Sequence, residues 1–200
     1  MRLVLASNNA KKLAELQALF APLGFDMVAQ GALGILEAEE PHVTFVENAL
    51  AKARHAAQAA GGPAIADDSG LCVDALGGAP GVLSARYATL FGGPRDDEAN
   101  NDALLQKLSG VTDRRARFVS ALVAVRSAQD PEPLIAFGRW EGEVLGKRRG
   151  RGGFGYDPLM FIPALGQTVA ELSAERKNTH SHRALAARQM LALMREVWRP

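Results

Sequence analysis

Hydrophobic residues at the start of the chain follow two spacings in turn. Residues 3–6 form a continuous apolar run, which is typical of a short buried strand. After a few small polar residues, apolar side chains recur at the spacing of one helix face, at Leu13, Leu16 and Phe20. Pro22 then interrupts this repeat. The pattern predicts a strand, a polar turn and a helix, which is how an α/β unit begins.

The next segment carries clear signals for the start and end of a helix. Thr44 and Glu47 have the spacing of a capping box, so we expect a helix to begin near Phe45. The helix should continue through an alanine-rich stretch and end at Gly61. A short apolar strand is predicted directly afterwards, over residues 64–66.

The second half of the chain predicts a long hairpin between helices. Residues 116–125 are apolar at both alternating positions, which indicates a strand buried on both faces. Residues 134–144 carry the charged residues Arg139, Glu141 and Glu143 at every second position, so we expect a strand with one wet side and an antiparallel pairing of the two. Helices are predicted over residues 96–108 and 181–198, and a short strand over residues 159–162.

The composition is that of an ordinary globular protein. The 200 residues are 48% hydrophobic and 22% charged, and no repeat or long linker divides them, so we expect a single domain over residues 1–200. The 23 basic and 22 acidic residues argue against a protein that coats nucleic acid or a membrane surface. The one cysteine, Cys72, cannot form an internal disulfide, and no apolar run reaches roughly 20 residues, so we expect a cytoplasmic protein.

The first segment with candidate chemistry is the polar turn and helix start over residues 7–12. Backbone N–H groups and the positive end of the helix dipole favour a phosphate at such a position. The segment consists of Ser7, Asn8, Asn9, Ala10, Lys11 and Lys12. It lacks the glycine pattern of a P-loop, so kinase or GTPase chemistry fits poorly. The alternative is an ordinary helix cap followed by exposed lysines.

Paired acids, Asp67 and Asp68, follow the predicted strand 64–66 and precede Ser69. A strand that ends in acids can hold a divalent cation and direct a base at a water molecule. Glu40, in an acidic loop, and Lys52, on the following helix, could face the same place. Mg²⁺ prefers one or two carboxylates together with substrate oxygens. The alternatives are a simple turn for the acid pair, a solvated loop for Glu40 and an exposed helical position for Lys52.

Two further segments carry groups that suit a nucleobase. One is the glycine-rich loop that contains Phe154, Gly155, Tyr156 and Asp157. Its glycines allow the backbone to approach a ligand closely, and its aromatic ring can stack on a base. The other segment, predicted at the start of the last helix, contains Lys177, His182 and Arg183. These side chains can donate to a phosphate or a carbonyl oxygen, and the alternative is an ordinary cap with surface side chains.

Taken in chain order, these motifs resemble the inosine triphosphate pyrophosphatase family. The matching segments are residues 7–12, 66–71, 78–87, 153–158 and 181–183. The resemblance implies an α/β/α two-lobed fold around a long mixed β-sheet with a deep central cleft, and a homodimer. It also implies Mg²⁺-dependent hydrolysis of dITP, ITP or XTP to the monophosphate and pyrophosphate.

The resemblance also implies roles for individual residues. Asp68 would be the general base and a metal ligand, and Glu40 a second metal ligand. The triphosphate would be held by residues 7–12, by Lys52 and by Ser69. Phe154 would stack on the base, and the edge of the base would be read by Asp157, Lys177, His182 and Arg183. Gly155 and Tyr156 would also belong to the substrate-binding loop. Donors from the last two would favour the 6-oxo group of hypoxanthine or xanthine over the amino group of adenine.

Two other functions remain open at the level of sequence. One is a Maf-like pyrophosphatase that acts on modified pyrimidine triphosphates. The other is a module that binds nucleotides or RNA without turnover, with the basic residues 147–151 as its contact surface. The near-neutral charge and the 6% aromatic content count against RNA.

Overall fold

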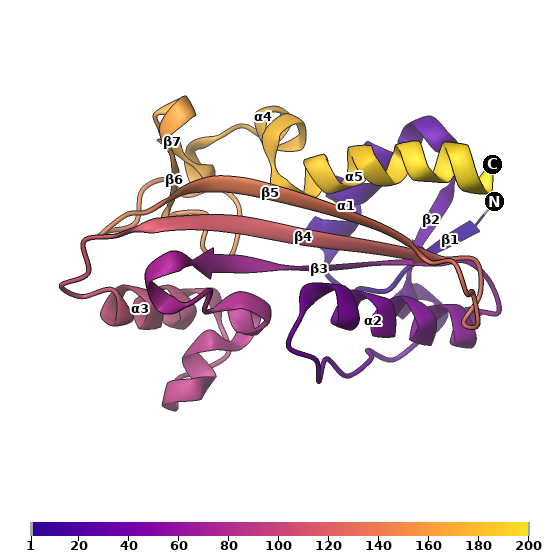
Figure 1. The fold of residues 1–200 in the computed structure, drawn as a ribbon, viewed down its shortest axis with the longest axis horizontal. Coiled ribbons are helices and arrows are strands. Elements are labelled where there is room, and N and C mark those ends of the chain that lie inside the picture. Colours follow the sequence, from indigo (N-terminus) through magenta and orange to yellow (C-terminus); the bar gives the residue numbers. More distant parts are fainter. Residues whose placement is uncertain (1, 200) are drawn as a thin grey trace. The chain divides into compact units, whose positions relative to one another are not determined.

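The computed structural model describes residues 2–199, and its strands form one mixed sheet in the order β2-β1-β3-β4-β5-β6-β7 (Figure 1). The strands are β1 (Arg2–Leu5), β2 (Asp26–Ala29), β3 (Ala64–Val73), β4 (Arg115–Val125), β5 (Leu134–Val144), β6 (Met160–Ile162) and β7 (Gln167–Thr168). The α-helices are α1 (Ala10–Phe20), α2 (Phe45–Ala60), α3 (Asp97–Lys107), α4 (Ala174–His180) and α5 (His182–Leu193). β1 pairs in parallel with β2 and β3, whereas β5–β6 and β6–β7 are antiparallel. The predicted α/β class with a mixed sheet is confirmed.

The chain divides into two compact units. The first consists of residues 1–68, 120–138 and 181–200, and the second of residues 69–119 and 139–180. The boundaries cut through β3, β4 and β5, so each of these long strands contributes to both units. The single two-lobed domain and its central cleft stay a prediction.

Alternation along the strands builds the layers of the first unit. Leu3 and Leu5 belong to a core that includes side chains of α1 and α5, whereas Val4 and Ala6 belong to a core that includes side chains of α2. Successive strand residues point to opposite faces of a sheet. Accordingly, α1 and α5 cover one face of the sheet in this unit and α2 covers the other (Figure 1). Four buried alanines on α2 allow this helix to lie close to the strands.

Helix α2 begins and ends where its local signals predict. The Thr44 hydroxyl accepts from the backbone N–H of Glu47, and Gly61 ends the helix in the left-handed conformation at φ 65°. A residue with a Cβ is strained at that φ, which explains the glycine.

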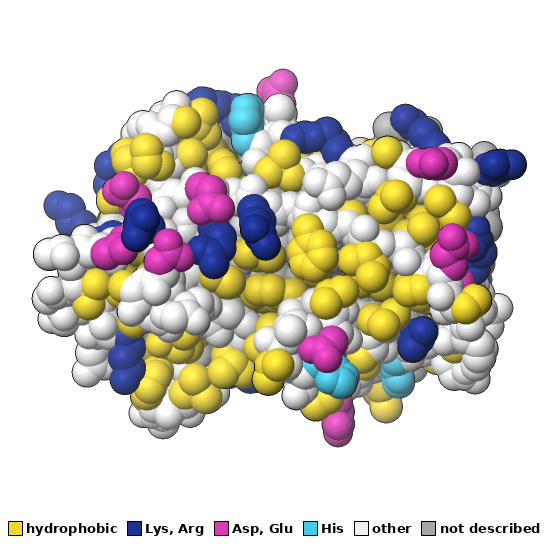
Figure 2. Space-filling view, in the orientation of Figure 1, with side chains coloured by type: hydrophobic (Ala, Val, Ile, Leu, Met, Phe, Trp, Pro, Cys, Tyr) yellow, Lys and Arg dark blue, Asp and Glu magenta, His cyan; other side chains and the backbone are white. Residues whose placement is uncertain are grey.

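The second unit has its own apolar core. Leu104 and Leu108, on or just after α3, pack with Phe118 of β4 and Trp140 of β5. Cys72 is buried and does not form a disulfide. Acidic and basic side chains are interspersed over the face of the protein in Figure 2, in keeping with the balanced composition. Within residues 2–199, no helix is long and apolar enough to cross a membrane.

Two sequence predictions are wrong in their element boundaries. The strand expected over residues 64–66 continues as β3 to Val73, so Asp67 and Asp68 lie inside a strand and not in a turn after it. Lys177 lies on the separate short helix α4, because Ser181 caps a new helix at that point. The last predicted helix is α5, followed by a π-helical turn over Met194–Trp198.

Candidate active site

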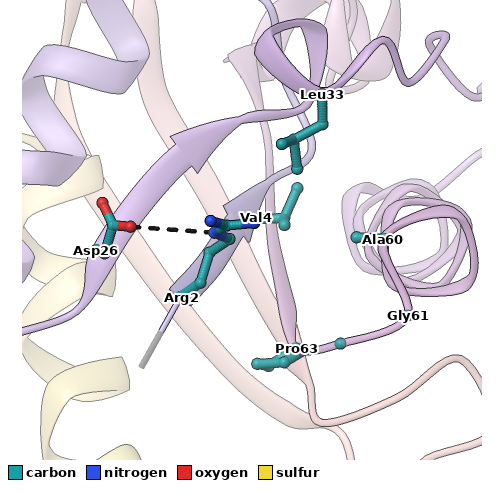
Figure 3. Close-up of a pocket in the computed structure, with 8 residues that line it drawn as sticks. Arg2, Val4, Asp26, Leu33, Ala60, Gly61 and Pro63 are labelled. Atoms are coloured by element: carbon teal, nitrogen blue, oxygen red, sulfur yellow. Dashed lines mark ion pairs between the residues drawn. The ribbon is translucent and has the colours of Figure 1, made fainter.

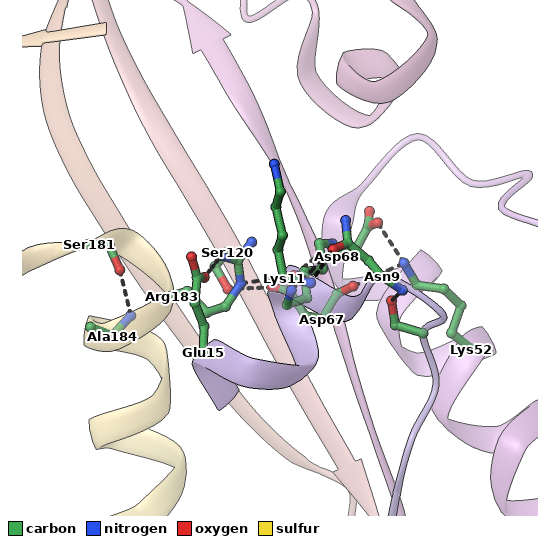
Figure 4. A network of polar contacts seen from close by, with 12 residues as sticks. Asn9, Lys11, Glu15, Lys52, Asp67, Asp68, Ser120, Ser181, Arg183 and Ala184 are labelled. Atoms are coloured by element: carbon green, nitrogen blue, oxygen red, sulfur yellow. Dashed lines mark hydrogen bonds and ion pairs between the residues drawn. The ribbon is translucent and has the colours of Figure 1, made fainter. Parts of the chain in front are cut away.

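Asp67 is the centre of a buried ion-pair network in the first unit (Figure 4). The residue is only 1% exposed. Its Oδ2 lies 2.8 Å from Lys12 Nζ and accepts from Arg183 Nε at 3.3 Å, and its Oδ1 accepts from Ser120 Oγ at 2.6 Å. Burial alone would raise the pKa of Asp67, but the two cations hold it well below the ordinary value. Asp67 is therefore ionised and satisfied on both oxygens.

Arg183 connects this network to helix α1. Arg183 is 1% exposed, and its guanidinium pairs with Glu15 as well as with Asp67. Burial opposes the charged form, yet the two carboxylates raise the pKa of Arg183 above its usual value. The first turn of α5 is thus fixed to α1 and β3 by charge-assisted hydrogen bonds, which are stronger than neutral ones.

Asp68 belongs to a second polar group, on the α2 side of the strand. Lys52 Nζ donates to Asp68 Oδ1 at 2.8 Å, to Glu40 Oε1 at 2.6 Å and to the carbonyl oxygen of Asp67 at 3.1 Å. The other oxygen of Asp68, Oδ2, is buried without a hydrogen-bond partner. Burial raises the pKa of Asp68, and the adjacent Lys52 only partly counteracts it.

The donors at Asp68 and Glu40 fit a magnesium ion. Two carboxylates lie together here, and both pair with the ammonium of Lys52, at 2.6 Å for Glu40 and 2.8 Å for Asp68. Among residues 2–199, no three His, Cys, Asp or Glu side chains are grouped to hold a metal by themselves. Mg²⁺ commonly takes only one or two carboxylates and completes its shell with water and phosphate oxygens. The pair therefore matches the chemistry of a metal that is shared with a phosphorylated substrate.

Residues 7–12 lie together at the start of α1 in the first unit. Asn9 is the N-cap, and its Oδ1 accepts from the backbone N–H groups of Lys11 and Lys12 at 3.0 and 3.1 Å. The Asn9 N–H donates to Ser7 Oγ at 3.2 Å, and Asn8 Nδ2 donates to Glu37 at 3.3 Å. The helix-cap alternative is thus realised here, while the ammonium group of Lys12 points to Asp67.

The predicted base-binding side chains Phe154, Asp157 and Lys177 lie together in the second unit. Lys177 Nζ is 2.9 Å from Asp157 Oδ2 and 4.5 Å from the centre of the Phe154 ring. The backbone N–H of Phe154 also donates to Asp157 Oδ2, at 3.0 Å. A Cβ at Gly153 would lie 2.0 Å from the same oxygen, so only glycine leaves room for this arrangement. Asp157 therefore organises its own loop and holds Lys177 beside the ring.

The rest of the loop is also fixed by hydrogen bonds. Gly155 donates to Asp97 Oδ2 at 2.7 Å and accepts from Asn101 Nδ2 at 2.9 Å. The Tyr156 hydroxyl is buried and donates to the carbonyl oxygen of Ser84 at 2.9 Å. Tyr156 is thus anchored in the core of this unit.

Each unit brings together one subset of the predicted residues. The first holds residues 7–12, Glu40, Lys52, Asp68, His182 and Arg183, and the second holds Ser69, Phe154, Gly155, Tyr156, Asp157 and Lys177. His182 is 7% exposed at the start of α5. The meeting of the two subsets around one nucleotide stays a prediction.

Sequence reasoning missed two members of the Asp67 network, Glu15 and Ser120. Glu15 follows Lys12 by three residues, which places both on one face of α1. Ser120 is a hydroxyl in the otherwise apolar stretch 118–125, and a buried hydroxyl requires a partner. Both signals are present in the sequence, but neither identifies which residue the side chain contacts.

A cavity of about 530 Å³ in the first unit lies apart from these groups (Figure 3). It is lined by residues that include Arg2, Val4, Leu33 and Pro63. Arg2 is paired with Asp26 at 4.0 Å, and both side chains are largely exposed. None of the predicted site residues lines this cavity.

The sequence profile of the Ham1 family matches residues 3–193. The chain belongs to the Ham1 family. Two Ham1 relatives are each 68% identical over 99% of both chains, and both are named dITP/XTP pyrophosphatase; they come from Leptothrix cholodnii and Methylibium petroleiphilum. The resemblance noted from the motifs is therefore confirmed.

Solved Ham1 structures share the fold. A HAM1 protein from Coxiella burnetii has a TM-score of 0.91 at 43% identity, covering 98% of this chain and 100% of the other. The Ham1 protein of Staphylococcus aureus has a TM-score of 0.86 at 38% identity, covering 98% and 99%. The mixed sheet with its flanking helices is thus a Ham1 architecture.

Proposed function

We propose that this protein hydrolyses dITP, XTP and ITP to the nucleoside monophosphate and pyrophosphate. The observation that carries the proposal is the state of Asp68, a buried carboxylate with a raised pKa and an oxygen without a partner, beside the cation of Lys52. The relatives named dITP/XTP pyrophosphatase, at 68% identity, supply the substrate class.

Asp68 is the proposed general base. A base works best when its pKa lies near the operating pH, and the raised pKa of Asp68 moves it in that direction. Its Oδ2 is the atom that would orient a water molecule and take its proton as the water attacks the α-phosphorus, while Oδ1 is engaged by Lys52. Pyrophosphate then leaves with the electron pair of the broken P–O bond.

Lys12, Lys52 and the start of α1 are proposed to hold the triphosphate. Both ammonium groups are largely buried and lie next to carboxylates, so they are fixed before a phosphate arrives. Glu40 and Asp68 would hold Mg²⁺, which when bound neutralises charge on the phosphate oxygens. Ser69, the residue after Asp68 on β3, is proposed to add a hydroxyl donor to a phosphate oxygen.

The base is proposed to lie on Phe154, with Asp157, Lys177, His182 and Arg183 at its edge. Donors from His182 and Arg183 would bond the 6-oxo group of hypoxanthine or xanthine. An adenine amino group would leave such donors unpaired, at a cost of about 1–3 kcal/mol each. Two carboxylates already fix the Arg183 guanidinium, so little side-chain entropy is lost when a base binds.

We also propose a homodimer in the cytoplasm. Ile135 and Phe137, on one side of β5, are 40% and 39% exposed, which supplies apolar surface for contact with a second copy. Light scattering on the eluting protein should give twice the mass of the 21.3 kDa chain. A monomer mass at micromolar concentration would exclude this assembly.

One assay tests the activity. The protein is incubated with Mg²⁺ and a panel of dITP, XTP, dATP, dGTP and modified pyrimidine triphosphates, and pyrophosphate and orthophosphate are measured separately. We expect pyrophosphate from dITP and XTP, and its loss in EDTA. Preference for a modified pyrimidine would favour a Maf-like substrate range. Nucleotide binding without release of either product would instead favour a non-catalytic nucleotide-binding module.

A further inference from the structure

Gly138 of β5 lies directly against the first turn of α5. A Cβ atom at Gly138 would lie 1.8 Å from the carbonyl oxygen of His182 and 2.7 Å from the backbone nitrogen of Ala186, whereas Cβ atoms essentially never approach another heavy atom within 3.0 Å. The φ of Gly138 is not positive, so this backbone conformation would accept any residue. Space alone therefore requires glycine here.

A glycine inside a strand normally weakens it, and often marks a close approach of two backbones. The buried face of β5 carries larger residues at Leu134 and Trp140 and small residues at Ala136 and Gly138 between them. Small residues meet where α5 crosses the strand, because Ala136 of β5 shares a core with Ala186 of α5. Gly138 continues this contact to the start of the helix.

The turn that Gly138 admits carries His182 and Arg183. Arg183 reaches Asp67 on β3 and Glu15 on α1 from this turn. We propose that Gly138 is a positioning residue of the base-recognition site, which sets how deeply the start of α5 lies on the sheet and so places both side chains. This inference rests on the proposed function, since it takes His182 and Arg183 as the groups that read the base.

The clash at Gly138 cannot be relieved by a change of rotamer, because both nearest atoms belong to the backbone of α5. An added methyl group must therefore move the helix start or the strand by roughly 1 Å, and a displacement of about 1 Å can cost on the order of 100-fold in an enzymatic rate or affinity. Asp68 and Lys52 lie on β3 and α2, outside the displaced turn. The effect should therefore fall on substrate binding and base selectivity more than on kcat.

Gly138→Ala and Gly142→Ala form a matched pair. Gly142 is on the same strand and the same face, and a Cβ there would lie 2.3 Å from the carbonyl oxygen of Phe161, within the second unit. For Gly138→Ala we expect the KM for dITP to rise by roughly tenfold to 100-fold, the preference for dITP over dATP to narrow, and kcat to change by less than about threefold. For Gly142→Ala we expect a lower melting temperature with unchanged KM and preference.

Two results would overturn the inference. One is a folded Gly138→Ala variant with the KM and base preference of the parent protein. The other is an equal rise in KM in both variants, which would indicate a general distortion of β5.

A second variant covers the case in which Gly138→Ala does not fold. Ser181 caps α5 by accepting from the Ala184 N–H at 3.1 Å, so Ser181→Ala loosens the same turn without a clash. It should raise the KM for dITP in the same direction by a smaller factor, and an unchanged KM would count against the inference.

Binding of dITP, measured by calorimetry in EDTA, separates this inference from the proposed function. Weaker binding by Gly138→Ala but not by Gly142→Ala supports the role of Gly138 even if the parent protein releases no pyrophosphate. That absence of turnover would count against hydrolysis alone. Equal dITP affinity in the parent and Gly138→Ala would overturn the role of Gly138.

Discussion

Asp67 and Asp68 are adjacent on β3 but have opposite surroundings. Successive strand residues alternate between faces, so Asp67 follows Ile65 toward the α1 and α5 side and Asp68 follows Ala66 toward the α2 side. Burial favours the neutral form of both carboxyl groups. At Asp67 the neighbouring cations prevail and the pKa is well below normal, whereas at Asp68 burial prevails and the pKa is raised.

The difference is consistent with one residue of this dipeptide stabilising the fold and the other taking the proposed catalytic role. Both Asp67 oxygens are engaged by cations and a hydroxyl, so this carboxylate is a poor proton acceptor. Asp68 keeps one oxygen without a hydrogen-bond partner and is easier to protonate. A strand therefore lets neighbouring residues of the same type have opposite pKa shifts, as the proposed roles of Asp67 and Asp68 require.

The largest effect is expected from Asp68→Asn. The amide cannot accept the proton of the attacking water, so kcat for dITP should fall by about 10²–10⁴-fold. Lys52 keeps Glu40 as a partner, and the fold should survive. Pyrophosphate release, dITP binding by calorimetry and thermal melting test the three parts of this prediction. Near-normal hydrolysis would remove Asp68 from its proposed role.

Asp67→Asn, in contrast to Asp68→Asn, should mainly lower the stability of the fold. The change leaves Lys12 and Arg183 with less counter-charge inside the protein, and breaking a buried pair in this way typically costs about 3–5 kcal/mol. Urea unfolding measures the loss. Ser120→Ala is the milder companion, because it removes only one donor from Asp67 and should cost about 1.5–3 kcal/mol. Wild-type stability in both variants would mean that the network is dispensable.

The dependence of stability on pH sharpens the same contrast. The folded pKa of Asp67 lies below its unfolded value of about 3.9, so its ionised form stabilises the fold above that pH. This contribution is lost as the pH falls through the folded pKa. We therefore measure the free energy of unfolding with urea, in EDTA, from about pH 7 to about pH 3. As the pH falls, it should decrease less steeply for Asp67→Asn than for the parent protein. The same pH dependence in both proteins would contradict a lowered pKa of Asp67 in the folded state.

The sequence predicted those features whose causes are local. The capping box at Thr44, the stop at Gly61 and the charged residues at every second position from 139 to 143 depend on neighbouring residues, and each element has the expected position. The polar residues at the start of α1 were correctly placed between a strand and a helix. The helix cap that Asn9 forms was already one of the alternatives for this segment.

Features that depend on distant partners were not predicted. Asp67 and Asp68 favour a turn by local propensity, but Lys12, Ser120 and Lys52 compensate their charge or hydrogen-bonding capacity inside a strand. Lys12 and Ser120 lie 55 and 53 residues from Asp67, Lys52 lies 16 residues from Asp68, and only the folded chain brings them together. The state of Asp68, with one oxygen unpartnered, likewise follows from packing and has no signature in the sequence.

Phe154→Ala tests whether base binding can be changed independently of the roles of Asp67 and Asp68. Loss of a stacking ring should raise the KM for dITP by roughly tenfold to 100-fold, equivalent to about 1–3 kcal/mol, with little change in kcat. Phe91→Ala is a matched control, because Lys107 lies 4.1 Å from the centre of its ring much as Lys177 lies 4.5 Å from Phe154. Steady-state kinetics of both variants decide the point, and equal KM values for the two would refute the stacking role.

Thr44→Ala should give the smallest effect, a loss of stability with no change in chemistry. The Thr44 hydroxyl accepts from the Glu47 N–H at 3.3 Å, and losing such a cap costs about 1 kcal/mol, or roughly 2–4 °C in melting temperature for a chain of this size. Lys52 lies about two turns further along α2, where the first turn no longer determines its position. We therefore expect unchanged kcat and KM well below the melting temperature. A fall in kcat together with stability would show that the start of α2 helps to place Lys52 beside Asp68, and the division between stability and chemistry would then not extend to this helix.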